Sequence, residues 1–257
     1  MPGPLRIEVA GDTNVGRKRN HNEDNLAILS DLGLYIVADG MGGHASGEVA
    51  SRMAVDTLRE FFMATADDPE RTWPYKMDRT KGYEENRLIT GIKLANLRIY
   101  EAARRNPQQR GMGTTVVALF TVEEGVYVGH VGDSRVYRIR DNTIEQLTED
   151  HSLLNDYIKM KRLSPDEIAS FPHKNVIVRA LGMKETVNVD TRFEVPRAGD
   201  MILLCSDGLS GPVSDQEILS IVTSTSDLSV AVNRLIERAN ENGGPDNVTC
   251  VLTRWVE

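Results

Sequence analysis

The segment Leu34-Tyr-Ile-Val-Ala-Asp-Gly-Met-Gly-Gly-His44 runs from an apolar, strand-like stretch into a glycine-rich turn, with Asp39 at the junction. Three more acids end an apolar run and open a turn that contains Gly or Asn: Asp133, Asp207 and Asp246. A strand that stops at a carboxylate presents it at the edge of a sheet, so several such strands can bring their acids together. Converging carboxylates repel one another and raise each other's pKa, so they require a cation. An all-oxygen site suits Mg²⁺ or Mn²⁺ better than Zn²⁺.

Each of these acids, taken alone, is more readily explained as a turn or helix-cap residue. The repetition of one strand-end pattern favours a metal site instead. Asp39 carries the strongest local signal, because it can bridge two cations and because Gly40 leaves its carbonyl open to a metal. The pattern therefore predicts a metal-dependent hydrolase, with a phosphoester as the expected substrate.

The bulk composition is typical of a globular protein, with 257 residues of which 40% are hydrophobic and 26% charged. A formal net charge of −8 argues against a nucleic-acid-binding surface, so no nucleic-acid partner is expected. No repeat, low-complexity stretch or linker divides the chain. We therefore expect one domain over residues 1–257.

Two features bear on the cellular compartment. Cys205 and Cys250 both lie inside apolar runs, which favours buried free thiols in a reducing environment over a disulfide. The start of the sequence lacks the apolar segment of a signal peptide, and no apolar run approaches the ~20 residues of a membrane span. The expected location is the cytoplasm, without a membrane segment.

The order of apolar patterns predicts an α+β fold. Helices are expected between blocks of antiparallel strands, which favours a β-sandwich flanked by helices over a parallel doubly wound sheet. Strands are predicted over 5–10, 25–30, 34–37, 187–195, 201–205 and 248–255, and helices over 48–63, 84–105, 214–222 and 226–240. The four segments 114–122, 126–131, 134–140 and 143–147 are predicted to form one antiparallel meander.

The segment from Gly16 to Asn25 combines basic residues with acids a few positions later. A phosphate needs a cation for its non-bridging oxygens, and Arg supplies two parallel hydrogen bonds. Arg19 is the preferred candidate, with Arg17 and Lys18 as alternatives. Glu23 and Asp24 are candidates for a second metal, directly or through water. Alone, this segment would also fit a solvated mixed-charge loop.

A histidine could protonate the leaving alkoxide, and the sequence contains five. His44 and His151 stand beside acid motifs and are the candidates. His130 lies inside a predicted strand and fits a core or edge position better. His21 and His173 carry no distinguishing signal.

Taken in order, these motifs resemble the metal-dependent, type 2C, Ser/Thr protein phosphatases, and the bacterial branch most closely. The resemblance extends nearly end to end, and although each motif is weak alone, all of them in register are specific. The matching motifs are Arg19 with Asn22-Glu-Asp24, Asp39-Gly-Met-Gly-Gly-His44, Gly113-Thr-Thr115, Val131-Gly-Asp-Ser-Arg135, Asp150-His-Ser152, Ser206-Asp-Gly-Leu209 and Asp246-Asn247.

The resemblance implies a four-layer α-β-β-α architecture, a central antiparallel β-sandwich with a helix pair on each outer face. It also implies two Mn²⁺ or Mg²⁺ ions in a cleft at one end. Asp39 would bridge them, Asp207 and Asp246 would complete one, and the Gly40 carbonyl with Glu23, through water, would serve the other.

Further roles follow from the same resemblance. Arg19 would hold the phosphate, and Asp133 would bind a third, weaker metal together with Asp207. Residues 153–175 match the family's flap. Two departures stand out, because many members carry an acid at the position of Gly211 and animal members carry a His at the position of Met41. Met cannot donate a proton, so the resemblance leaves the identity of the general acid open. His44, three residues after Met41, is the histidine named here as catalytic.

The expected reaction is direct hydrolysis of phosphoserine or phosphothreonine by a metal-bridging hydroxide, without a phosphoenzyme and without either Cys. The expected partners are phosphorylated signalling proteins, including a cognate Ser/Thr kinase, and the expected state is a monomer. Two alternatives are a small-molecule phosphoesterase and a pseudophosphatase that binds phosphoproteins. The latter class usually loses metal acids, whereas Asp39, Asp207 and Asp246 are present here.

Overall fold

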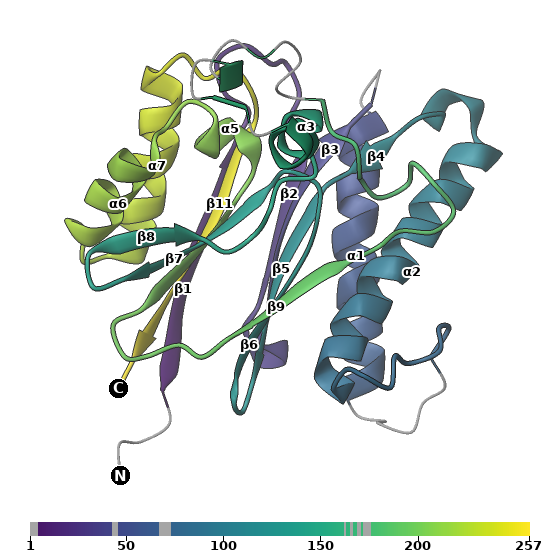
Figure 1. The fold of residues 1–257 in the computed structure, drawn as a ribbon, viewed down its shortest axis with the longest axis horizontal. Helices are drawn as coiled ribbons and strands as arrows, with labels where there is room; N and C mark the ends of the chain where they lie inside the picture. Colours follow the sequence, from purple (N-terminus) through teal and green to yellow (C-terminus); the bar gives the residue numbers. More distant parts are fainter. Residues whose placement is uncertain are drawn as a thin grey trace.

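Two antiparallel β-sheets face each other, and a helix pair covers the outer face of each (Figure 1). The computed structural model describes residues 5–42, 46–66, 73–161, 163–164, 167–168, 171 and 176–257. This arrangement confirms the predicted α+β sandwich with four layers. None of the described helices is long and apolar enough to cross a membrane.

The chain passes from one sheet to the other several times. In the first sheet the order is β1 (Arg6–Asn14), β11 (Val248–Val256), β10 (Met201–Cys205), β7 (Arg135–Arg140) and β8 (Thr143–Gln146). In the second it is β2 (Asp24–Leu29), β3 (Leu34–Met41), β5 (Val116–Val122), β6 (Gly125–Val131) and β9 (Asp190–Glu194), with β4 (Gly113–Thr114) paired to the end of β3.

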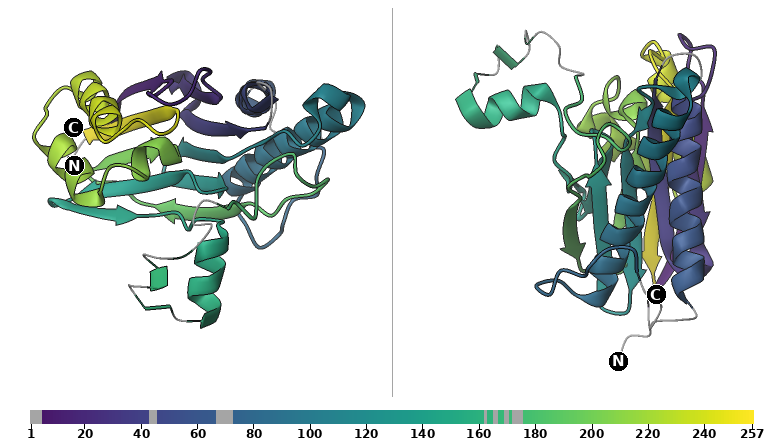
Figure 2. Two further views of the ribbon diagram at one scale, coloured as in Figure 1. Left: turned by 90° about the horizontal axis from the view of Figure 1, so that it is seen from above. Right: turned by 90° about the vertical axis from the view of Figure 1, so that its right-hand side faces the viewer.

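Helices α1 (Ser46–Ala66) and α2 (Tyr83–Arg105) pack on the second sheet, and α6 (Asp215–Thr223) and α7 (Leu228–Glu241) pack on the first (Figure 2). A capping box stands at the start of α6, with Ser214 as the N-cap and Glu217 as its partner. The remaining helical elements are η1 (Ser30–Leu32), η2 (Pro107–Gln109), α3 (Leu153–Lys161) and the one-turn α5 (Asp207–Ser210).

Both faces of the central strands are buried, which explains why their sequences read as continuous apolar runs. In β3, Leu34 and Ile36 pack toward the helices, while Tyr35 and Val37 pack toward the opposite sheet. Strand β10 alternates in the same way, with Leu203 in the layer under α6 and α7. The core is therefore built of three apolar layers.

The predicted four-strand meander is wrong. Strands β5 and β6 belong to one sheet, whereas β7 and β8 belong to the other, because the chain crosses between sheets at residues 132–134. Gly132 makes this crossing with a φ of +115°, a conformation that L side chains rarely adopt. The crossing places Asp133 in the gap between the two sheets instead of in a hairpin turn.

The region proposed as a flap is described in part. Helix α3 stands away from the sandwich in both views of Figure 2. Ser164 and Glu167 form a cap-like pair, since Ser164 Oγ accepts from the Glu167 N–H at 3.3 Å. Residues 162, 165–166, 169–170 and 172–175 lie outside the described residues. The strand predicted over 187–195 is shorter, at Asp190–Glu194.

Candidate metal centre

The predicted acids meet at one end of the sandwich. Asp24 opens β2 and lies opposite Asp39 near the end of β3 in the strand register. Asp207 follows β10, and Asp246 precedes its neighbour β11. Asp133 follows β6 at the crossing between the sheets. Strand ends from both sheets therefore deliver their carboxylates to the same place, as the sequence pattern predicted.

The electrostatics of Asp39 show how close these acids lie. Burial is the largest cause that raises the pKa of Asp39 well above its usual value, and Asp24, Asp207, Asp133 and Asp246 each raise it further. Charge interactions of this kind require that all four carboxylates lie near Asp39. Asp39 is thus at the centre of the cluster.

The pKa values of three other acids in the cluster are also raised. Burial raises the pKa of Asp24 to about 6, although hydroxyls that bond it act in the opposite direction. Burial and then Asp207 raise the pKa of Asp133 to about 7. Burial and then Asp246 raise the pKa of Asp207. The cluster is therefore an electrostatically unfavourable arrangement that a divalent cation would relieve.

Unpartnered oxygens give an independent indication of a cation site. One Oδ1 atom each of Asp24, Asp133 and Asp207 is buried and has no hydrogen-bond partner among the described residues. Leaving such an atom unsatisfied typically costs about 1–3 kcal/mol. An all-oxygen set of this kind fits Mg²⁺ or Mn²⁺, which bind carboxylates, carbonyls and water.

Hydroxyl groups fix the orientation of Asp24. Its Oδ2 accepts from Ser206 Oγ at 2.8 Å and from Thr249 Oγ1 at 2.6 Å, both from the opposite sheet. This leaves Oδ1 as the oxygen without a partner. Ser206 belongs to one of the sequence motifs, but no motif includes Thr249. The contact of Thr249 with Asp24 depends on the packing of the two sheets and is not predictable from the local sequence.

The backbone of Asp39 is held by the segment at β4. Thr114 Oγ1 and the Thr115 N–H both donate to the Asp39 carbonyl, at 2.9 and 2.8 Å. The Asp39 N–H donates to Thr115 Oγ1 at 3.0 Å. The Gly-Thr-Thr sequence thus orients the central acid, a role that the sequence alone did not reveal.

Glu23 borders the cluster. Its N–H donates to Asn247 Oδ1 at 2.8 Å, and its side chain lies against Gly47 at the start of α1. Gly40 is close to the same helix, because a Cβ at Gly40 would lie 2.1 Å from the Gly47 carbonyl oxygen. Burial, the largest cause, raises the pKa of Glu23, which Arg19 lowers and Asp246 raises.

Among the three basic candidates, Arg19 has a side-chain hydrogen bond to the cluster. Its Nη2 donates to Asp246 Oδ2 at 2.7 Å, and its side chain is 53% exposed. Arg17 and Lys18 donate their backbone N–H groups to the Gly244 carbonyl. The geometry therefore places the Arg19 guanidinium at the mouth of the acid cluster.

A pocket of about 480 Å³ opens beside the acids. Asp133, Asp207 and Asp246 line it, together with Leu154 of α3. Gly211 also lines it, so the position at which many relatives carry an acid faces this space without a carboxylate. The pocket gives a substrate access to the acids from the side of the proposed flap.

The histidine predictions have different outcomes. His151 is wrong as a proton donor, because it is buried and both ring nitrogens are hydrogen bonded. His130 is buried at the end of β6, as expected of a core position. His44 lies outside the described residues.

Comparisons with known proteins agree with this geometry. The model of the family "Protein phosphatase 2C" matches residues 13–257. The serine/threonine phosphatase stp of Listeria welshimeri is 39% identical over 249 residues, covering 93% of this chain and 92% of that protein. The structure of the Mycobacterium tuberculosis serine/threonine phosphatase PstP/Ppp has a TM-score of 0.83 at 35% identity, covering 98% and 100%. A structure of the PstP catalytic domain in complex with two manganese ions has a TM-score of 0.80 at 33% identity, with the same coverage.

Proposed function

The chain belongs to the protein phosphatase 2C family, and we propose that its carboxylate cluster holds two Mn²⁺ or Mg²⁺ ions for the hydrolysis of phosphoserine and phosphothreonine in proteins. The observation that carries the proposal is the set of buried, unpartnered carboxylate oxygens on Asp24, Asp133 and Asp207 around Asp39. The function is that of a metal-dependent phosphoprotein phosphatase.

In this proposal Asp39 would be shared by the two ions. Asp207 and Asp246 would hold one ion, and the Gly40 carbonyl and Glu23, through water, would hold the other. Asp24 contributes to the same site through its unpartnered oxygen. Bound divalent ions would supply an activated water nucleophile and neutralise charge on the phosphate.

Arg19 binds the phosphate. Its exposed guanidinium is held beside the acids by Asp246, and it can present two parallel N–H groups to the non-bridging oxygens. Because Asp246 already orients the side chain, little conformational entropy remains to be lost when the phosphate binds. Arg19 thereby stabilises the charge that develops on the equatorial oxygens.

Proton donation to the leaving alkoxide falls to His44 in this proposal. Met41 has no proton to give, and the nitrogens of His151 are committed to other partners. A His44→Gln variant is expected to lower kcat more than it raises KM, and more strongly for substrates with a poor leaving group.

A third, weaker metal site is part of the proposal. Asp133 and Asp207 both line the 480 Å³ pocket and both have an unpartnered oxygen. Gly211 adds no carboxylate there. Fewer charged ligands mean weaker binding, so this ion should be held less tightly than the other two.

The proposed partners are phosphorylated Ser/Thr proteins, among them a cognate Ser/Thr kinase, and the proposed state is a monomer. A cytoplasmic location is inferred from the two cysteines. Cys205 and Cys250 lie opposite each other in β10 and β11, yet both are free thiols, which fits a reducing compartment.

The test is phosphate release from a phosphothreonine peptide with Mn²⁺ and with EDTA, and p-nitrophenyl phosphate serves as the small-molecule comparison. We expect release that requires the metal and a higher kcat/KM for the peptide. Asp39→Asn and Asp207→Asn should abolish activity in a folded protein. Release from metabolite-like esters alone would favour a small-molecule phosphoesterase, and none from either substrate would favour a pseudophosphatase.

A further inference from the structure

His151 contacts both backbone polar groups of Gly132, one through its side chain and the other through its backbone. The Gly132 N–H donates to His151 Nδ1 at 3.0 Å, and the backbone N–H of His151 donates to the Gly132 carbonyl at 2.9 Å. The position requires Gly, because its φ of +115° is unfavourable for most residues and a Cβ would lie 2.7 Å from the Thr115 side chain. His151 therefore holds the residue that directly precedes Asp133.

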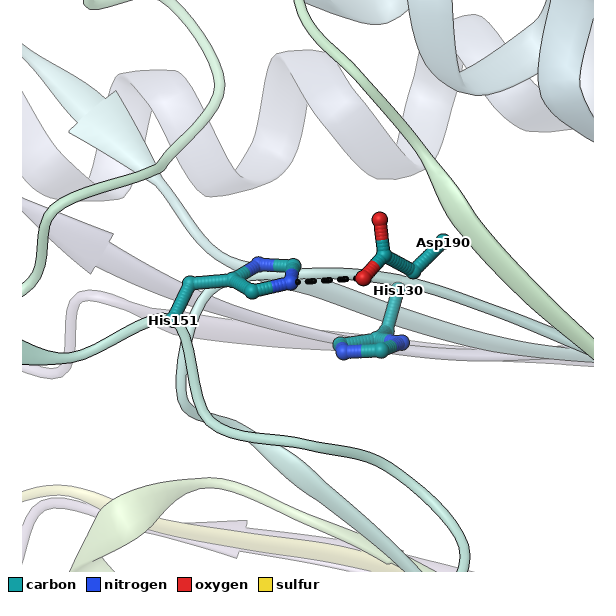
Figure 3. A group of neighbouring side chains, drawn as sticks. All are labelled: His130, His151 and Asp190. Carbon is teal, nitrogen blue, oxygen red and sulfur yellow. Dashed lines mark hydrogen bonds and ion pairs between the residues drawn. The ribbon is translucent and has the colours of Figure 1, made fainter. Parts of the chain in front are cut away.

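The opposite side of the imidazole is anchored as well. His151 Nε2 lies 3.1 Å from Asp190 Oδ2, the interaction drawn in Figure 3. Arg179 Nη1 donates to the other oxygen of Asp190 at 2.7 Å. Since Nδ1 accepts the Gly132 proton, the ring must carry its own proton on Nε2 and donate it to Asp190. Asp190 thus fixes the tautomer that Gly132 requires.

The cluster of His130, His151 and Asp190 also has ligand atoms within 4.8 Å of one another, a spacing that a metal ion could use. The hydrogen bonds argue against that role. A metal on His151 Nε2 would displace the proton donated to Asp190, while Nδ1 still accepts from Gly132. His130 Nε2 bonds the Glu149 carbonyl at 2.9 Å, and its ring stacks on His151 with centroids 4.7 Å apart.

Asp133 is held on its other side by different contacts. Ser134 Oγ lies 2.7 Å from Thr115 Oγ1, and Arg135 bonds both oxygens of Asp150. On the Gly132 side, the His151 imidazole accepts from the Gly132 N–H, and the backbone N–H of His151 donates to the Gly132 carbonyl. Replacing the imidazole would therefore remove one of the two contacts that hold this side of the crossing segment, while the other side stays fixed.

We propose that His151 is a positioning residue, which holds the Asp133 carboxylate in place for the weaker metal site through Gly132, and that Asp190 and Arg179 set its orientation. The proposal rests on the proposed function for the identity of that site. His151 also contacts the segment that follows the proposed flap. The Val178 N–H donates to the His151 carbonyl at 2.9 Å, where the chain returns to the sandwich.

Three variants separate positioning from simple packing. In His151→Asn, the amide oxygen stands near the position of Nδ1 and can still accept from Gly132. In His151→Gln, the amide nitrogen stands near Nε2 and can still donate to Asp190, but the acceptor for Gly132 is lost. His130→Gln is the matched control, since it removes the equally buried stacked ring and keeps a donor for Glu149.

The first measurement is Mn²⁺ binding, followed by electron paramagnetic resonance of free Mn²⁺, together with the thermal unfolding temperature. We expect His151→Gln to weaken the weakest Mn²⁺ site by about tenfold, as is typical when a residue that orients a ligand is lost. His151→Asn should retain most of the affinity, and His130→Gln should bind Mn²⁺ like the wild type.

A double-mutant cycle tests whether His151 acts through Asp133. Asp133→Asn should abolish the weakest Mn²⁺ site, and adding His151→Gln should cost nothing more in activity. Additive losses, or equal losses in His151→Asn and His151→Gln, would overturn the positioning role. If His151→Gln does not fold, Asp190→Ala at a half-exposed position takes its place and should give a smaller loss in the same direction.

Failure of the proposed function would look different. A wild-type protein that releases no phosphate from any substrate would contradict the phosphatase assignment, whereas Mn²⁺ binding by the variants would still report on His151. In the metal-free protein, ¹⁵N spectra of the imidazole provide a check that needs neither activity nor metal. A proton on Nδ1 instead of Nε2 would overturn the inferred hydrogen bond from Gly132.

Discussion

Asp24 and Asp39 lie directly opposite each other in neighbouring strands, at the end of the sheet where the other acids meet. Like charges at opposed positions destabilise a strand pair. The pKa of both groups is raised, chiefly by burial, and Asp24 is also among the causes that raise that of Asp39. The sheet therefore keeps an unfavourable pair at the position where the proposed metal binds.

The first prediction concerns the stability of the metal-free protein. A carboxyl whose pKa is raised by folding stabilises the fold below its unfolded pKa of about 3.9, and this contribution is lost as the pH rises through the folded pKa. With Asp24 at about 6 and Asp133 at about 7, the free energy of unfolding in EDTA should fall between about pH 4 and pH 7.

Thermal unfolding in EDTA at pH 5 and pH 7.5, each repeated with Mn²⁺, checks this prediction. The melting temperature should be lower at pH 7.5, and Mn²⁺ should raise it more at that pH than at pH 5. The Asp39→Asn variant should melt higher than the wild type in EDTA at pH 7.5 and lose most of the response to Mn²⁺. Equal melting temperatures at both pH values would contradict the electrostatic description.

The second prediction addresses Arg19. Replacing it by Ala should lower kcat/KM for a phosphothreonine peptide by about 10- to 100-fold, because the phosphate loses a bidentate charged partner. Arg19→Lys should recover only part of this loss, since an ammonium cannot form two parallel hydrogen bonds. Steady-state kinetics at saturating Mn²⁺ provide the measurement.

Lys18→Ala is the matched control for Arg19. Lys18 belongs to the same basic segment, and its recorded contact is the backbone hydrogen bond to the Gly244 carbonyl, which the substitution keeps. Its kcat/KM should stay within about twofold of the wild type, as expected for a surface charge. If Lys18→Ala lowered kcat/KM as much as Arg19→Ala, the loss would be due to the reduced positive charge of the segment and not to a specific contact of Arg19 with the phosphate.

The third prediction is that neither cysteine takes part in the reaction. Burial raises the pKa of the Cys205 thiol to about 12 and that of Cys250 well above its usual value. Thiols of this kind are almost never ionised at neutral pH and react slowly. Incubation of the native protein with iodoacetamide should leave phosphatase activity unchanged, and rapid inactivation with modification of either residue would contradict this.

The positions of the acids were predictable from the sequence because the signal is local. A buried strand reads as an apolar run, and an acid at its end, such as Asp39 or Asp207, is visible without knowledge of its neighbours. The capping box at Ser214 is local in the same way. These patterns place carboxylates at strand ends, and closure of the sandwich then brings them together.

Features that depend on sheet pairing were not predictable. The crossing at Gly132 was expected to be a turn within a meander, because four short strands in succession give no sign that the chain changes sheet. His151 was a reasonable proton donor by its position beside an acid, yet its partners are Gly132 and Asp190. Thr249 acquires its role only because the two sheets pack face to face.

The last prediction tests the role of Thr249. Its hydroxyl donates to Asp24 Oδ2 and thereby lowers the pKa of that acid. In Thr249→Val this hydrogen bond is lost, so the proton should compete better with the metal. We expect the half-saturating Mn²⁺ concentration for phosphate release at pH 7 to rise about twofold, because Asp24, with a pKa of about 6, is mostly ionised at that pH in the wild type.

Thr253→Val provides a matched control on the same strand. Thr253 is also buried, but its hydroxyl donates to the Ile202 carbonyl inside the first sheet, away from the acids. Thr253→Val should lose about 1–2 kcal/mol of stability from its missing hydrogen bond, and Thr249→Val should lose more, because Thr249 Oγ1 also bonds Thr13 Oγ1 at 2.6 Å. Only Thr249→Val should change the Mn²⁺ requirement. The fraction of Asp24 that is protonated falls as the pH rises. The increase in the Mn²⁺ requirement of Thr249→Val should therefore become smaller between pH 7 and pH 8.5. A defect that is the same at both pH values would show that Thr249 orients Asp24 without tuning its pKa.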